Sequence, residues 1–145
     1  MLNNLKSLGK KAKNALKNNI DTKTKNKVLN YFAYLIKKQK KLILRENIKD
    51  VIYAKKKKLK GNLINRLRID SIKLQSIQTN VKNIAKLKDP TNVTLNKWQR
   101  PNGLTIKRIS VPIGIIGLIY ESRPNVTSDV SSLCFKSGNA VILRG

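Results

Sequence analysis

Two short apolar runs constrain the fold of this 145-residue chain more than any other feature. Residues 113–120 are almost wholly apolar and rich in isoleucine, which is typical of a strand covered on both faces in a parallel sheet. Residues 140–143 predict a second buried strand, and residues 127–136 predict an intervening helix that Gly138 ends. A strand, a helix and a strand in about thirty residues make a βαβ unit. We therefore expect an α/β fold with parallel strands.

Helical periodicity dominates the chain before this unit. Apolar residues recur at three- and four-residue spacing through residues 2–16, 28–36 and 72–87, as in helices with one buried face. Side chains of these helices and of residues 127–136 that we expect to face inward are Val28, Leu29, Phe32, Leu35, Ile36, Ile72, Ile77, Val81, Ile84, Leu87, Val130, Leu133 and Cys134.

Capping residues and breaks predict where the helices begin and end. Asp21 or Thr22 caps the second helix, and Asp70 caps the last one, which Asp89-Pro90 ends. The stretch 42–60 is less regular, and Gly61-Asn62 is its expected break.

The apolar pattern changes from helical to strand-like after the turn Pro101-Asn102-Gly103. Residues 104–111 alternate apolar and polar side chains, as a strand exposed on one face does. We therefore divide the chain into a helical region, 1–100, and a sheet-forming region, 101–145.

The composition excludes several classes of function. There is no histidine and one cysteine, so these residues hold no ordinary zinc site, no Ser-His-Asp triad and no internal disulfide. The longest apolar run is far shorter than a membrane span, and the first residues do not resemble a signal peptide. We expect a cytoplasmic protein that binds no membrane.

A net charge of +25 raises the alternative of a basic helical nucleic-acid-binding protein. Of the 32 basic residues, however, 25 are Lys and 7 are Arg, whereas groove and phosphate recognition favours arginine. Lys, Asn and Ile all have A/T-rich codons, so base composition alone can raise the lysine count. We therefore expect no specific nucleic-acid partner.

The segment YESRPNVT, residues 120–127, is the strongest candidate site. It gathers a phenol, a carboxylate, a guanidinium and an amide where a buried strand ends and a helix begins, a position suited to an anion such as phosphate. The alternative is a helix-capping turn in which Arg123 and Glu121 form a local ion pair. Both remain open at the level of sequence.

Two other features have structural interpretations. Gly114 and Gly117 do not match the G-x-G-x-x-G dinucleotide fingerprint, so we expect a bulge or a close backbone approach. Cys134 lies mid-helix among apolar neighbours without a nearby base, so we interpret it as a buried structural thiol.

The stretch VPIGIIGLIYESRPNVTSDVSSLCFKSGNAVILRG, residues 111–145, closely resembles gamma-glutamyl phosphate reductase, of the aldehyde dehydrogenase superfamily. Weaker similarity extends upstream through NRLRIDSIKLQSIQTNVKNIAKLKDP. The resemblance implies N-terminal helices followed by the first βαβ unit of an incomplete, aldehyde-dehydrogenase-like NADP-binding domain. The chain has about a third of the length expected of a complete member, so we expect an N-terminal fragment.

The resemblance also implies a reaction. The family reduces L-glutamate 5-phosphate with NADPH to L-glutamate 5-semialdehyde in proline biosynthesis, through a cysteine thiolate that attacks the acyl group. That cysteine follows well downstream of the NAVILRG segment, and Cys134 does not match it. We expect the 145-residue chain alone to lack reductase activity, and the full-length family to form homo-oligomers.

Site residues follow position by position from the resemblance. Ile119, Tyr120 and Glu121 match the end of the strand that lines the cofactor cleft. Arg144 matches the position that holds the adenosine ribose, where a guanidinium suits a 2′-phosphate. The superfamily's oxyanion-stabilising position falls on Arg123 or on Asn125, and this choice stays open. No metal ligand is expected, and a third interpretation is an interaction module that docks through its sheet edge.

Overall fold

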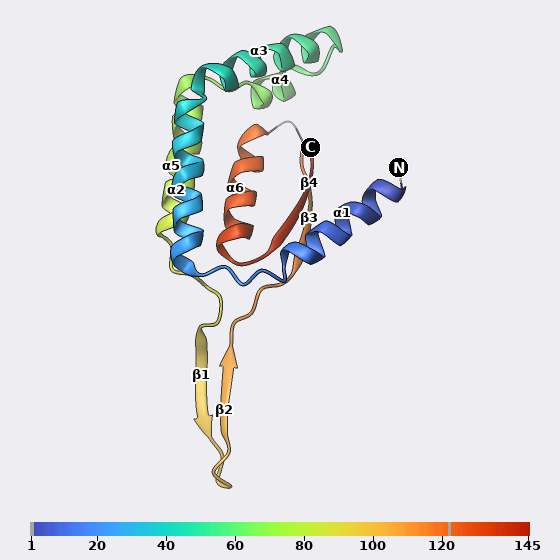
Figure 1. Cartoon of the computed structure of the whole chain (residues 1–145). Coiled ribbons are helices and arrows are strands. Elements are labelled where there is room, and N and C mark those ends of the chain that lie inside the picture. The colour runs from blue at the N-terminus through green and yellow to red at the C-terminus, as the bar shows by residue number, and fades with distance from the viewer. Residues whose placement is uncertain (1, 122) are drawn as a thin grey trace.

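The predicted βαβ unit is present at the C-terminal end of the chain. The computed structural model describes residues 2–121 and 123–145. Strands β3 (Ile115–Ile119) and β4 (Ala140–Arg144) pair in parallel, and α6 (Pro124–Lys136) connects them and packs on β4. In Figure 1 the helix lies to one side of the two strands. The expected α/β fold is confirmed.

Helix α6 begins three residues earlier than the predicted 127 because Pro124 occupies its first turn, where the fixed φ of proline suits a helix. It ends as predicted. Gly138 adopts φ +71, and the backbone N–H of Asn139 donates to Cys134 O at 2.8 Å.

The expectation that residues 113–120 form a strand covered on both faces is wrong. Strand β3 is shorter, because Gly114 turns the backbone to φ +119 and donates its N–H to Asn139 Oδ1 at 2.8 Å. Ile115 and Ile119 are 41% and 81% exposed, whereas the alternate residues of β3 are half-buried. The side of β3 that carries Ile115 and Ile119 is therefore uncovered in the described chain.

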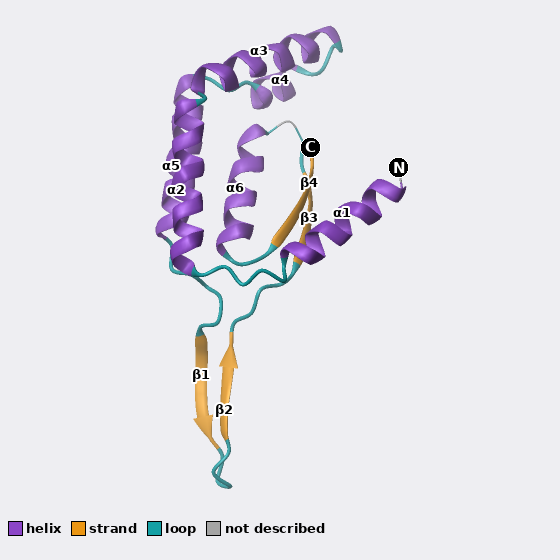
Figure 2. Cartoon of the chain, viewed as in Figure 1, coloured by secondary structure: helices purple, strands orange, loops and turns teal. Residues whose placement is uncertain are grey.

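Helices account for most of the described chain before the sheet. They are α1 (Leu2–Ala15), α2 (Thr22–Lys38), α3 (Lys40–Lys56), α4 (Gly61–Leu67) and α5 (Ser71–Lys86). Figure 2 shows α2 and α5 running alongside each other, with α3 and α4 at one end of the pair.

The predicted N-caps are correct, and the predicted break is not. The Asp21 side chain accepts from the Thr24 backbone N–H at 2.8 Å, and that of Asp70 accepts from the Lys73 N–H at 2.7 Å. Gly61 is the first residue of α4, however. The chain turns before it, where Lys58 adopts φ +54.

The core lies between α2 and α5. Its buried residues are Leu29, Ala33, Ile36, Leu74, Ile77, Val81, Ile84 and Ala85, with Phe32 and Phe135 packed against them. Four side chains expected inside are instead exposed, namely Val28 (44%), Ile72 (78%), Leu87 (53%) and Leu133 (48%). On α5 the buried stripe begins at Leu74, and a residue two positions earlier points to the opposite side of a helix.

A β-hairpin separates the helices from the βαβ unit. Strands β1 (Thr94–Gln99) and β2 (Thr105–Ile109) pair antiparallel through the predicted turn, where Gly103 has φ +82. The hairpin projects away from the other elements in Figure 1. Residues 94–99, placed above in the helical region, are therefore a strand, and the last helix before it ends at Lys86.

Two buried lysines make polar contacts between elements that are distant in the sequence. Lys25 of α2 is 4% exposed and contacts Asp89 Oδ2 at 2.9 Å. Lys136, at the end of α6, is 2% exposed and donates to the Asn26 side-chain oxygen and to Ala85 O. The periodicity of the sequence gave no sign of either contact.

Candidate functional site

The carboxyl ends of β3 and β4 lie side by side and carry most of the predicted site residues. Ile119 and Arg144 are register partners at the last position of the parallel pair, and both are exposed. The backbone N–H of Tyr120 donates to Arg144 O at 2.9 Å and extends the pairing by one residue. Ligands of open α/β sheets bind at this end of the strands.

Tyr120 joins three segments at this edge. Its hydroxyl is hydrogen-bonded to Thr127 Oγ1 in the first turns of α6. Its ring lies against Gly145, where an added Cβ would come within 3.0 Å of the ring. The half-buried phenol therefore fixes the residues that follow β4 relative to the start of α6.

Glu121 and Arg123 flank Ser122, which lies outside the described residues. Both side chains are exposed, and no ion pair joins them in the described part of the chain. Arg123 stands at the N-cap of α6 but makes no side-chain capping bond. The alternative of a local ion pair at this turn is thus not what the structure shows, and the guanidinium faces solvent.

Asn125 is exposed and lines a small, open surface cavity of about 260 Å³ between α4, α5 and α6. The cavity wall also includes Arg66, Arg68 and Lys73, although these lie 52 or more positions before Asn125 in the sequence. The amide Nδ2 donates to Asp129 Oδ2 at 3.3 Å. Arg123 does not line this cavity, so the structure separates the two candidates for the oxyanion position.

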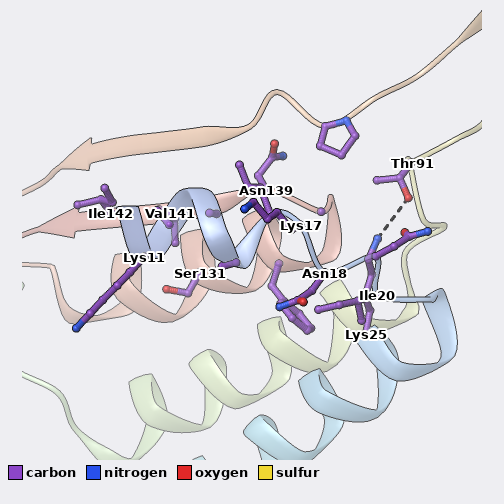
Figure 3. A pocket seen from close by; sticks show the side chains of 18 of the residues that line it. Lys11, Lys17, Asn18, Ile20, Lys25, Thr91, Ser131, Asn139, Val141 and Ile142 are labelled. Atoms are coloured by element: carbon purple, nitrogen blue, oxygen red, sulfur yellow. Dashed lines mark hydrogen bonds between the residues drawn. The ribbon is translucent and has the colours of Figure 1, made fainter. Parts of the chain in front are cut away.

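A larger cavity of about 990 Å³ lies elsewhere, between α1, α6 and β4. Figure 3 shows Lys11, Lys17 and Asn139 around it, together with the hydrogen bond from Lys25 to Thr91. It extends from the residues before β4 along that strand as far as Leu143, the residue before Arg144. Its volume alone therefore does not make it the candidate active site, because its lining includes none of Ile119, Tyr120, Glu121, Arg123, Asn125 and Arg144.

Cys134 is 6% exposed on the inner side of α6, and burial raises the pKa of its thiol. A raised pKa lowers the fraction of nucleophilic thiolate at neutral pH. The interpretation of Cys134 as a buried structural thiol is confirmed for its position.

The described residues lack two features. No three His, Cys, Asp or Glu side chains there gather closely enough to hold a metal ion. No helix within residues 2–121 and 123–145 has both the length and the apolar character to span a membrane.

Comparison with known proteins identifies relatives of this chain. No protein-family model matches the chain. A curated gamma-glutamyl phosphate reductase of Caldanaerobacter subterraneus is 47% identical over 138 residues, which cover 94% of this chain and 33% of that protein. One of Desulforamulus reducens is 42% identical over 99% of this chain and 35% of its own length. The chain thus spans about one third of the length of these relatives.

Solved structures agree with the curated relatives. The gamma-glutamyl phosphate reductase of Thermotoga maritima superposes with a TM-score of 0.88 at 38% identity, covering 94% of this chain and 33% of that structure. That of Saccharomyces cerevisiae gives 0.86 at 32% identity, over 93% and 34%. None of these proteins is named as a nucleic-acid-binding protein, so the alternative drawn from the net charge receives no support.

Proposed function

Because this chain belongs to the gamma-glutamyl phosphate reductase family over the third of the relatives' length that it spans, we propose that it contributes the start of a reductase's nucleotide-binding domain. The proposed reaction is the NADPH-dependent reduction of L-glutamate 5-phosphate to L-glutamate 5-semialdehyde and phosphate, in proline biosynthesis. The observation that carries this proposal is the 47% identity over 94% of the chain.

The residues at the carboxyl end of the sheet fit a phosphorylated nucleotide. Exposed Ile119 offers an apolar surface beside the exposed guanidinium of Arg144. We assign Arg144 to the 2′-phosphate of NADPH, and Ile119, Tyr120 and Glu121 to the wall of the cofactor cleft. When bound, the nicotinamide supplies a hydride to the acyl carbon.

Two further roles belong to the same end of the molecule. Asn125 or Arg123 stabilises the charge that develops on the acyl oxygen or on the leaving phosphate. Cys134 has no part in the reaction, since its thiol is buried and its pKa is raised. We further propose that the complete reductase is a cytoplasmic homo-oligomer, like the family the sequence resembles.

Nucleotide binding tests the proposal on the chain itself. Titration with NADPH and with NADH, followed by nicotinamide fluorescence, should give tighter binding of NADPH. Arg144→Gln should weaken NADPH about tenfold while leaving NADH nearly unchanged, because one charge-assisted contact to the 2′-phosphate is lost. Arg108→Gln, an exposed arginine of the hairpin, is the matched control.

Each result bears on a different part of the proposal. Failure of the wild-type chain to bind either nucleotide would refute the assigned cofactor site. An equal loss of affinity for NADPH and NADH in Arg144→Gln would refute the role of Arg144 in 2′-phosphate selection. Oxidation of NADPH by this chain on addition of L-glutamate 5-phosphate would contradict the assignment of Cys134 as structural.

A further inference from the structure

The cavity at Asn125 gathers three cations that have no carboxylate partner. Their exposed side chains, those of Arg66, Arg68 and Lys73, line an open surface cavity, and none of them is in an ion pair in the described part of the chain. No aspartate or glutamate lines the cavity, although isoleucines form part of its wall. Like charges gathered around one concave surface repel one another, so an anion bound among them relieves that repulsion.

The backbone that carries the two arginines is held in place by a buried side chain. Asn47 of α3 is 5% exposed, and its Nδ2 donates to Leu67 O at 2.9 Å. Its Oδ1 accepts from the Ile69 N–H at 2.7 Å. A single amide thus fixes the residues that alternate with Arg66 and Arg68, which pre-organises the segment between α4 and α5.

Lys73 adds a second constraint on the same segment. Its Nζ donates to Asn65 O at 3.2 Å and to Arg68 O at 2.9 Å, at the end of α4. This contact places the ammonium group beside the arginines and satisfies carbonyls at the helix terminus. The backbone that carries the three cations is therefore held by hydrogen bonds from Asn47 and Lys73.

The cavity has a size and a position that suit a small metabolite. Its volume of about 260 Å³ lies just below the roughly 300 Å³ at which pockets for drug-sized ligands begin. Pro124 and Asn125, the first residues of α6, close one side. In Figure 1, α4 lies at the end of the molecule toward which β3 and β4 point.

We propose that Arg66 and Arg68, with Asn125 opposite, form a subsite for the α-carboxylate of an amino acid whose other end reacts at the sheet edge. A planar guanidinium binds a carboxylate through two parallel hydrogen bonds. Asn125 directs its Nδ2 toward Asp129, which leaves Oδ1 free to accept from an α-ammonium group. This subsite rests on the proposed function, because it orients L-glutamate 5-phosphate by the end remote from the phosphate. With Asn125 engaged at that end, the oxyanion position falls to Arg123.

Titration of the full chain with L-glutamate, followed by NMR, tests the subsite without nucleotide. We expect shifts at the backbone amides of Arg66 and Arg68 and at the Asn125 side-chain amide. Arg66→Gln and Arg68→Gln should each weaken L-glutamate about three- to tenfold, as expected for one charge-assisted contact. Arg45→Gln, at an exposed arginine paired with Glu46 away from the cavity, should change nothing.

Two comparison ligands identify the group that is recognised. The compound 4-aminobutyrate lacks the α-carboxylate and should bind at least about fivefold more weakly than L-glutamate. Equal binding of the two compounds, or equal affinity in the arginine variants, would overturn the proposal. Equivalent shifts on addition of inorganic phosphate would also overturn it, by assigning the cavity to the phosphate end of the substrate.

The outcome is separable from that of the nucleotide titration. If NADPH binds and L-glutamate does not shift the cavity residues, only the subsite is refuted. If L-glutamate binds and neither nucleotide does, the subsite stands and the proposed cofactor site falls.

Discussion

The ion pair between Lys25 and Asp89 predicts a large effect of a small substitution. The two side chains are 4% and 10% exposed. The Asp89 carboxylate accepts from Lys25 Nζ at 2.9 Å, from Thr22 Oγ1 at 2.9 Å and from the Thr91 N–H at 3.0 Å. It also accepts from Thr91 Oγ1 at 2.7 Å. One carboxylate therefore connects α2 with the loop that follows α5.

Asp89→Asn keeps the size of the side chain and removes its charge. Lys25 is then left buried without a counter-ion, and an amide presents an N–H₂ group to donors that need an acceptor. Loss of one partner of a buried pair destabilises a protein by about 3 to 5 kcal/mol. We expect the lower end, about 3 kcal/mol, because the remaining amide oxygen still accepts one hydrogen bond.

Acid titration provides a second measurement. Burial alone would raise the pKa of Asp89, but hydrogen bonds from Lys25, Thr91 and Thr22 outweigh it and hold the pKa well below the usual value of 3.8. A carboxyl group with a lowered folded-state pKa stabilises the fold above its unfolded pKa. This stability is lost progressively as the pH falls below about 4. Asp89→Asn should lack this portion of the acid destabilisation.

Urea unfolding followed by far-ultraviolet circular dichroism measures both effects. Glu46→Gln is the control, since it removes an exposed carboxylate paired with Lys49 and Arg45, and its unfolding midpoint should not change measurably. In the double variant Lys25→Met with Asp89→Asn, the loss should be smaller than the sum of the two single losses. An unchanged midpoint in Asp89→Asn, or strict additivity in the double variant, would refute the argument.

Two substitutions and one chemical modification test the packing of the helices. Gly138→Ala should lower the free energy of unfolding by about 1 to 3 kcal/mol in urea titrations, because φ is +71 and the new Cβ would lie 3.1 Å from Pro112. Leu29→Ala should lower it by about 2 to 5 kcal/mol, since that core side chain is 2% exposed. Cys134 should react with iodoacetamide at least about tenfold more slowly in the folded chain than in urea, and equal rates would contradict its burial.

Local signals in the sequence predicted local structure well. Asp21 and Asp70 cap helices because a short carboxylate reaches the backbone N–H three residues ahead, an interaction contained within one turn. Gly138 ends α6 because only glycine enters the left-handed region without steric penalty. The apolar runs at 113–120 and 140–143 predicted two strands, which pair over 115–119 and 140–144, because β-branched side chains favour extended backbone.

Burial was harder to predict, because it depends on which elements cover a face. Residues 113–120 have the composition of a strand enclosed on both sides, yet Ile116 and Leu118 on one side of β3 are half-buried and Ile119 on the other is 81% exposed. The apolar run indicates that the strand favours apolar surroundings. It does not indicate which elements of the described chain pack against each face of the strand.

Contacts between distant residues could not be predicted from periodicity at all. Lys25 and Lys136 belong by type among exposed residues, but both are buried because their amino groups reach acceptors on other elements. Asn47 likewise meets Leu67 and Ile69 only through the packing of α3 against α4. Each contact satisfies a polar group that a pattern of apolar spacing does not represent.

The positive charge shows most clearly why local arrangement matters more than composition. A net charge of +25 favours any polyanion through long-range attraction, and in a sequence it is a single sum. In the structure Arg45 neutralises Glu46 on an exposed helix, whereas Arg66 and Arg68 share a cavity wall that contains no carboxylate. Selectivity for a small carboxylate comes from that second arrangement, because a shaped cavity limits both the size of the anion and the direction from which it is bound.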